Sequence, residues 1–178
     1  MSILHNNKMS TGNKYKICIV IILILIAGAA IPEYFAVTTT KSLNKRIFFI
    51  DRGRHVEKLK TGDYVMFSLL KSKKENDLPS KLVKMIEDDG GYSQIKRIGC
   101  SAGEELKNIG NDYYCDNKFI AKAKNYSLGG ERLKKFEFSG RIPEGYIFLV
   151  GDHSDSYDSR YFGFIKVTDI ITTVTPLF

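Results

Sequence analysis

The sequence predicts a small, mainly antiparallel β domain that follows one apolar N-terminal helix. Three observations support this fold class. The chain has 178 residues, 43% of them hydrophobic, which is enough for one domain with a core. One long apolar run without charge lies near the N-terminus. After it, short runs of β-branched and aromatic residues alternate with polar turns, as in strands.

The apolar run from Ile17 to Ile31 predicts an export signal or a membrane anchor. It contains no charged residue, follows Lys14 and Lys16, and is stopped by Pro32. Its 15 residues are fewer than the roughly 20 that span a bilayer as a helix, and small side chains near its end also suit a signal-peptide cleavage site. A buried core helix is disfavoured because no polar face interrupts the run. We favour a retained anchor.

This segment divides the chain by compartment. Residues 1–16 form a basic N-terminus that stays in the cytoplasm, because lysines flank the segment on that side. Residues 17–37 form the anchor or signal. Residues 38–178 form a periplasmic domain at the bacterial inner membrane, with a cleaved periplasmic form as the alternative. Within this domain we expect a polar insertion at 71–91.

Six runs predict strands of the domain, and one stretch predicts a helix. The strand runs are Ile47–Ile50, Tyr64–Phe67, Tyr113–Cys115 with Phe119-Ile120 as a hairpin, Tyr146–Val150, and Ile170–Val174. The apolar residues of the 71–91 insertion have helical spacing between Pro79-Ser80 and Gly90-Gly91. We expect a short helix on this insertion.

The charge and the cysteines restrict the possible functions. The net charge is +7, but the 24 basic and 20 acidic residues after residue 32 are interleaved, whereas nucleic-acid binding needs a concentrated basic stripe. We expect no nucleic-acid partner. Cys18 lies in the apolar run, and Cys100 and Cys115 lie in the exported part. A bridge between the latter two is predicted in an oxidising compartment, with two free buried thiols as the alternative.

Several catalytic arrangements find no support in the sequence. There is no G-x-S-x-G motif for a Ser-His-Asp hydrolase, and the acidic turn 152–158 lacks the ligand pattern of a calcium loop. A serine can instead use a neutral lysine as its base, if burial lowers the pKa of the amine. Ser42 and Lys96, the latter between isoleucines on a predicted strand, fit this pair. On spacing alone, a linker serine and an ordinary strand lysine remain the alternative.

The order of the motifs resembles that of type I signal peptidases, and more closely their TraF-type branch of conjugative transfer peptidases. The resemblance covers about Val37 to the C-terminus. The matching parts are Thr40-Lys41-Ser42, Gly62-Asp63-Tyr64-Val65, Ile95-Lys96-Arg97-Ile98, Pro143-Glu144-Gly145-Tyr146, and the box from Gly151 to Gly163 (GDHSDSYDSRYFG). His153 in that box and the Thr-Lys-Ser context favour the TraF branch.

The resemblance implies the roles of the site residues. Ser42 would be the nucleophile and Lys96 the general base, with the Ser42 backbone N–H and the Thr40 hydroxyl holding the oxyanion. Ser156 would orient the lysine amine. Asp158 and Arg160 would brace the site. No cofactor or metal is implied.

The implied function is that of a membrane-tethered serine endopeptidase. It would process exported precursors with N-terminal or pilin-type signal segments at the lipid bilayer, beside other conjugative transfer proteins. The alternatives are a general leader peptidase, a non-catalytic component of a secretion assembly, and a self-cleaving repressor, which the apolar segment disfavours. The sequence departs from the family pattern at two places. The family has a proline soon after the serine, where this chain has Leu43-Asn44-Lys45-Arg46. The family has Gly-Asp after the lysine motif, where this chain has Gly103-Glu104.

Overall fold

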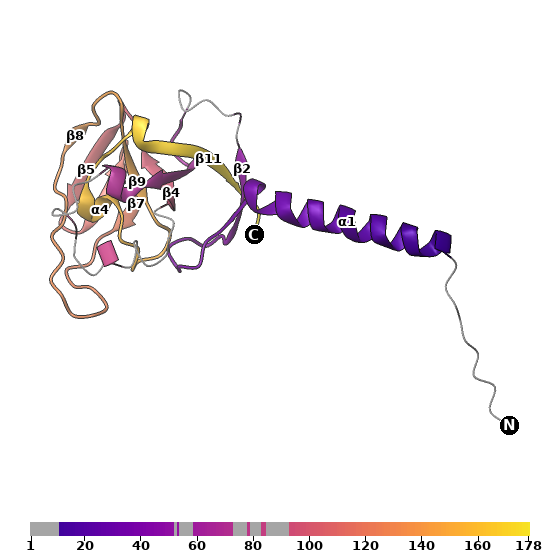
Figure 1. The fold of residues 1–178 in the computed structure, drawn as a ribbon. Helices are drawn as coiled ribbons and strands as arrows, with labels where there is room; N and C mark the ends of the chain where they lie inside the picture. The colour runs from indigo at the N-terminus through magenta and orange to yellow at the C-terminus, as the bar shows by residue number, and fades with distance from the viewer. Residues whose placement is uncertain (1–10, 52, 54–58, 73–77, 79–82, 85–92) are drawn as a thin grey trace. The chain divides into compact units, whose positions relative to one another are not determined.

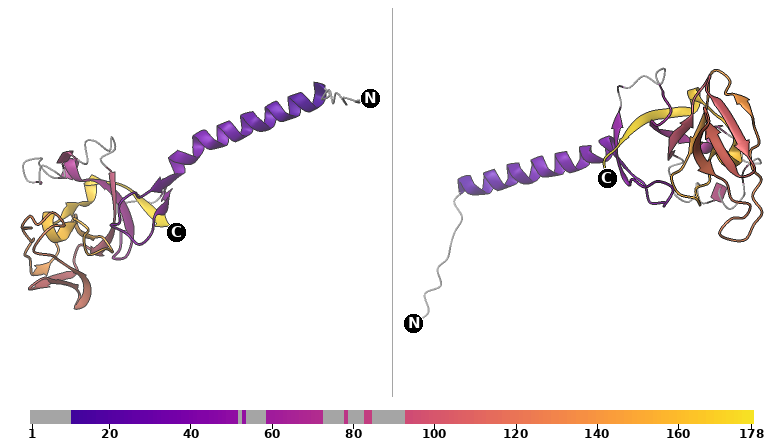
Figure 2. Two further views of the ribbon diagram at one scale, coloured as in Figure 1. Left: turned by 90° about the horizontal axis from the view of Figure 1, so that it is seen from below. Right: turned by 180° about the vertical axis from the view of Figure 1, so that it is seen from behind.

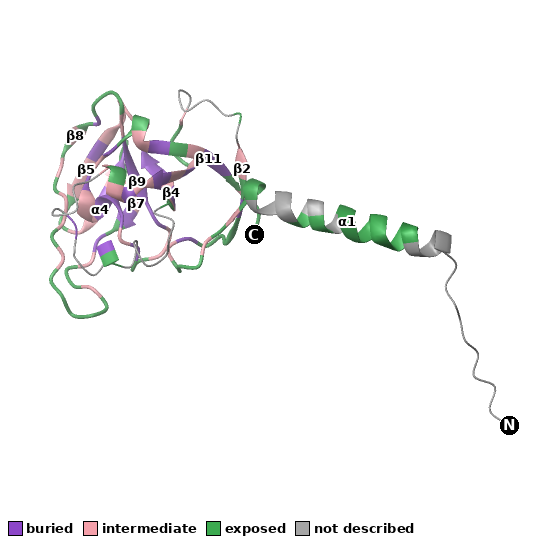
Figure 3. Ribbon diagram, in the orientation of Figure 1, coloured by how far each residue is buried: buried purple, intermediate pink, exposed green. Residues whose placement is uncertain are grey.

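The computed structural model describes residues 11–51, 53, 59–72, 78, 83–84 and 93–178. The chain forms two compact units, Met1–Phe35 and Ala36–Phe178. The first contains α1 (Thr11–Tyr34), a helix of 24 residues, on which the described apolar side chains between Ile17 and Leu25 are exposed (Figure 3). In the described part of the chain, no helix has both the length and the hydropathy needed to cross a bilayer.

The second unit is built from two mainly antiparallel sheets (Figure 1). Among the described residues, the larger sheet has the order β1-β2-β11-β3-β4-β9-β10 and the smaller has the order β7-β6-β5-β8. The strands of the larger sheet are β1 (Phe35–Val37), β2 (Ile47–Asp51), β3 (Tyr64–Ser68), β4 (Ser93–Cys100), β9 (Tyr146–Val150), β10 (Ile165–Lys166) and β11 (Ile170–Pro176). Those of the smaller sheet are β5 (Glu105–Ile109), β6 (Asp112–Cys115), β7 (Lys118–Lys122) and β8 (Gly140–Arg141).

The predicted mainly antiparallel β fold is confirmed, and the six predicted strand runs lie in β2, β3, β6, β7, β9 and β11. The hairpin turns at Asp116 and Asn117, whose φ values of 45° and 64° are left-handed. Asp and Asn tolerate this conformation better than other side chains, and it matches the twist of a two-residue hairpin. The described strand β5 was not predicted, because its sequence ELKNI has no uninterrupted apolar run.

Strand β4 lies inside the larger sheet, between β3 and β9. Figure 2 shows the strands of this unit from two further directions. Its register pairs Lys96 with Val65 of β3. Ile95 packs in one cluster of buried apolar residues and Ile98 in another. Because side chains alternate along a strand, both faces in the middle of β4 pack against apolar residues, while the side chain of Arg97 stays 26% exposed.

The buried residues gather on the strands of the second unit, shown in purple in Figure 3. A cluster around Phe67, Ile98 and Leu149 fills one region, and a second one around Leu106, Tyr113 and Phe148 packs under the smaller sheet. The helix α4 (Ser159–Phe162) lies between β9 and β10, inside the box from Gly151 to Gly163 that carries predicted site residues.

The helix predicted within 71–91 falls mostly outside the described residues. Of that insertion, residues 71–72 end the helix α2 (Leu69–Ser72), and Val83 and Lys84 are helical. Leu78 and Val83 are 7% and 6% exposed and pack against the core cluster that contains Leu69. The insertion thus has apolar contacts with the domain.

Candidate active site

Lys96 is buried on β4, with 4% of its surface exposed. Its amine Nζ donates a hydrogen bond to the hydroxyl Oγ of Ser156 at 2.9 Å. Burial lowers the pKa of Lys96 from 10.5 to about 8, although the negative charges of Asp158 and Asp152 oppose this effect. The site therefore holds a lysine that is close to neutral under mildly alkaline conditions, as a general base requires.

Ser42 lies in the turn between β1 and β2 and is half-buried. The hydroxyl of Thr40 donates to Ser42 Oγ at 3.1 Å. The following residue, Leu43, is 5% exposed and packs in one cluster with Phe48 and with Ile95, the residue before Lys96. This apolar contact fixes the serine turn beside the strand that carries the lysine.

The glycine turn after β9 contacts both predicted catalytic residues. The backbone N–H of His153 donates to the carbonyl of Ser42 at 3.1 Å. A Cβ atom added at Gly151 would lie 2.7 Å from that carbonyl oxygen and 2.1 Å from Ser156 Oγ. Only a glycine fits between them, so the turn brings the backbone of Ser42 and the partner of Lys96 together.

Asp158 and Arg160 form a buried ion pair, with exposed fractions of 0% and 1%. The guanidinium donates to the carboxylate at 2.6 and 2.7 Å, in a bidentate arrangement. The carboxylate also accepts from Gly151 N–H at 2.7 Å, and Arg160 donates to the carbonyl of Ser156 at 3.0 Å. The ion pair therefore holds the turn in place at Gly151 and at Ser156. This is the turn that contacts Ser42 and Lys96.

The structure places a further carboxylate in this region that we did not select from the sequence. Asp152 accepts hydrogen bonds from Arg97 Nε at 3.1 Å, from the backbone N–H of Asn44 at 3.3 Å and from the hydroxyl of Tyr64 at 3.4 Å. Asp152 and Arg97 lie inside the matched motifs, which was the available signal. Tyr64 also lies in a matched motif, Gly62-Asp63-Tyr64-Val65, but its bond to Asp152 joins residues 88 positions apart and forms only on folding.

The cysteines lie at the end of β4 and on β6 and form a disulfide, Cys100–Cys115, with an S–S distance of 1.98 Å. In the described residues, these two cysteines and Glu104 are also a group close enough together to hold a metal ion. The disulfide uses both sulfur atoms, and thiolates are the form that binds metal. This group is therefore a covalent link between two strands and offers no thiolate ligands.

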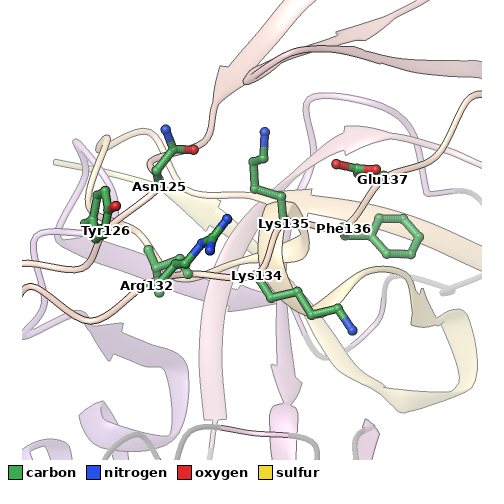
Figure 4. A pocket seen from close by; sticks show the side chains of 8 residues that line it. Asn125, Tyr126, Arg132, Lys134, Lys135, Phe136 and Glu137 are labelled. Carbon is green, nitrogen blue, oxygen red and sulfur yellow. The ribbon is translucent and has the colours of Figure 1, made fainter.

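A cavity of about 890 Å³ lies elsewhere, along the connection between β7 and β8 (Figure 4). Its lining includes Tyr126, Arg132 and Phe136 and contains none of the predicted site residues. The size of a cleft alone does not show that it binds a ligand. The candidate active site is therefore defined by the bond of Lys96 to Ser156 and by the bonds of Ser42 to Thr40 and His153.

A known protein family matches nearly the whole sequence. The model of the family described as signal peptidase, peptidase S26, matches residues 12–178. No curated protein matches the chain. Among solved structures, a signal peptidase I from Enterococcus faecalis V583 matches at 22% sequence identity with a TM-score of 0.40, over 66% of this chain and 97% of that one. Because the family model covers nearly the whole sequence, the chain belongs to the peptidase S26 family of signal peptidases, which are serine-type peptidases.

Proposed function

We propose that the protein is a membrane-tethered signal peptidase of the TraF type, with Ser42 as nucleophile and Lys96 as general base. The single observation that carries the proposal is the buried amine of Lys96. It is bonded to Ser156 at 2.9 Å, on the same turn that contacts the backbone of Ser42. Burial brings its pKa to about 8, where a neutral amine is available to accept a proton.

The proposed reaction has two steps. Ser42 Oγ attacks the scissile carbonyl and Lys96 takes the hydroxyl proton, which it then gives to the departing amine. The acyl-enzyme ester is next attacked by water or by an amine. Lys96 takes the proton of this second nucleophile and returns it to Ser42 Oγ as the ester bond breaks. The negative charge on the carbonyl oxygen is held by the Ser42 N–H and by the hydroxyl of Thr40, which lies 3.1 Å from Ser42 Oγ.

Exposed apolar surface supports a location at a lipid bilayer. On α1, seven described side chains between Ile17 and Leu25 are each at least 45% exposed. A second apolar surface consists of Val37, Ile47, Leu177 and Phe178, which are 36–77% exposed, and Leu177 N–H bonds to the carbonyl of Ile47 at 2.8 Å. Exposed apolar surface of this extent indicates a lipid or protein partner. Tethering raises the effective concentration of precursors whose signal segments lie in the same membrane.

The catalytic assignment is tested with the purified full chain in detergent and a precursor containing a signal segment. Ser42→Ala and Lys96→Ala are expected to abolish cleavage. Lys96→Arg is also expected to be inactive, because a guanidinium does not lose its proton near neutral pH. Ser154→Ala is the matched control, since Ser154 is an exposed hydroxyl on the same turn. Cleavage by Ser42→Ala would overturn the proposed function, and cleavage by Lys96→Arg would overturn the proposed base.

The TraF type is tested by substrate choice. The chain has His153 in its final box and Thr-Lys-Ser at the nucleophile, which is the basis for proposing pilin-type precursors of a conjugative apparatus. A pilin precursor and an ordinary secreted precursor are offered to the same enzyme at equal concentration. Preferential cleavage of the pilin precursor supports the TraF assignment. Equal or better cleavage of the secreted precursor identifies a general leader peptidase instead.

A further inference from the structure

The carboxylate of Asp152 connects three segments that are distant in the sequence. Its partners are the backbone N–H of Asn44, two residues after Ser42, the hydroxyl of Tyr64 on β3, and Arg97 on β4. The side chain of Asp152 is 12% exposed; its bonds to Tyr64 and Arg97 are partly buried, and its bond to the Asn44 N–H is exposed. Hydrogen bonds to a carboxylate are stronger than those between neutral groups.

We propose that Tyr64 and Asp152 act as a pair of positioning residues that hold the turn following Ser42 in place for its reaction with Lys96. This inference rests on the proposed function. It adds that the nucleophile is placed by a hydrogen-bond chain, running from the Tyr64 hydroxyl through the Asp152 carboxylate to the Asn44 N–H. Neither residue contacts the reacting atoms.

The turn needs such a restraint because of its sequence. The family has a proline soon after the serine, and a proline fixes the backbone by its ring. This chain has Leu43-Asn44-Lys45-Arg46 there, so the backbone keeps both its freedom and its N–H donors. One of those donors, Asn44 N–H, is bonded to Asp152 at 3.3 Å. Together with the buried side chain of Leu43, this bond gives the turn two points of attachment.

Tyr64 is suited to support Asp152. Its ring packs against Phe48 of β2, with centroids 5.5 Å apart, and its register partner on β4 is Arg97. The two donors therefore reach the carboxylate from neighbouring strands. Burial raises the pKa of Tyr64, as does the charge of Asp152. The hydroxyl thus keeps its proton and remains a donor over the whole working pH range.

Asp152 differs from Tyr64 in its effect on the base. The charged groups that act on Lys96 are Asp158, Arg160 and Asp152. Asp152 is negative and stabilises the ammonium, so its removal is expected to lower the pKa of Lys96 further. The Tyr64 hydroxyl is neutral, so its removal leaves the charges around Lys96 unchanged. The two residues can therefore be separated by a pH profile.

The test measures kcat, KM and the pH profile of the full chain in detergent on a signal-segment peptide. Tyr64→Phe is expected to lower kcat about tenfold, the loss typical of one hydrogen bond to a charged group, with KM and the pH midpoint unchanged. Asp152→Asn is expected to lower kcat and to shift the midpoint to lower pH. Because the two residues act through one chain, the double variant is expected to lose less than the product of the single losses. Tyr114→Phe is the matched control, a half-buried tyrosine on β6.

Three results would overturn the inference. The first is a Tyr64→Phe enzyme with the kcat of the Tyr114→Phe control. The second is independent, multiplicative losses in the double variant. The third is an Asp152→Asn enzyme whose melting temperature falls while its pH profile stays in place, which indicates a purely structural role. If Ser42→Ala cleaves the peptide, the proposed function itself fails. If only Tyr64→Phe is unaffected, the dyad stands and the positioning chain fails.

Discussion

Burial and three charged groups shift the pKa of Lys96 in opposite directions. Burial disfavours its positive charge, and so does Arg160, while Asp158 and Asp152 favour it. Burial has the largest effect and brings the pKa to about 8. The two acids keep it from falling further, so that the proposed base is strong enough to take a proton and still neutral in part near pH 7.

This balance predicts a rise of activity with pH. Below about 8, Lys96 is mostly an ammonium and cannot accept a proton. About a tenth of the amine is neutral at pH 7 and about nine-tenths at pH 9, so kcat is expected to increase about tenfold over that range. The rate of peptide cleavage by the wild-type chain is measured between pH 6 and 10. A rate that falls across this interval, or that is flat from pH 6, would contradict Lys96 as the base.

At the residue scale, the sequence predicts those site residues that lie in contiguous motifs. Lys96, Ser156, Asp158 and Arg160 are recognisable because they lie in the Ile95–Ile98 motif and in the box 151–163, which resemble those of signal peptidases; spacing alone leaves Lys96 an ordinary strand lysine. The bond of Tyr64 to Asp152 spans 88 residues. Such a bond depends on the pairing of β3 with β4, and one sequence without its relatives contains no sign of that pairing.

At the element scale, β4 has two functions in this fold. It carries Lys96 in the middle, and its last residue, Cys100, is joined to Cys115 at the end of β6. Both cysteines are buried in the cluster that also contains Leu106 and Phe148. The disulfide therefore connects the strand of the proposed base to the smaller sheet.

Removal of this disulfide is expected to destabilise the domain and to leave its chemistry in place. For a sequence separation of 15 residues, the chain-entropy model gives about 3 kcal/mol, and this corresponds to a fall in melting temperature of roughly 10 °C for a domain of this size. Thermal unfolding of the Cys100→Ala/Cys115→Ala variant is compared with that of the wild type. Cys18→Ser, which removes an exposed free cysteine, is the control and should unfold as the wild type does. Equal melting temperatures for all three chains would contradict the prediction.

Some strands of the fold could be predicted from local sequence, and others could not. Runs such as Tyr146–Val150 can be predicted as strands from composition alone, because they are continuously apolar. In the structure their side chains are mostly buried on both faces of the sheet. The described strands β8 and β10 have two residues each, which is too short for any periodicity. The division into two sheets depends on which strands pair, and this is decided by long-range packing that local sequence does not specify.

At the scale of the whole molecule, the proposed catalytic residues and the exposed apolar helix lie in different units. All the proposed catalytic residues, from Thr40 to Arg160, lie in the unit Ala36–Phe178. The other unit, Met1–Phe35, contributes the exposed apolar helix α1. Under the proposed function, chemistry resides in the one and access to membrane-bound precursors in the other, and each can be disabled separately.

This division predicts that charges in α1 release the protein from membranes and spare its chemistry. Ile22 and Leu25 are 54% and 66% exposed, and a charged side chain in place of each removes apolar surface and weakens the attachment of an apolar helix to lipid. Ile22→Lys/Leu25→Lys is expected to move from the carbonate-washed membrane pellet to the supernatant, while Ile22→Val/Leu25→Ile stays in the pellet. In detergent, both variants should cleave a short soluble peptide at the wild-type rate, because no proposed catalytic residue lies in α1. If the lysine variant remains in the pellet, α1 is not the tether, and the apolar surface formed by Val37, Ile47, Leu177 and Phe178 becomes the site of attachment to test.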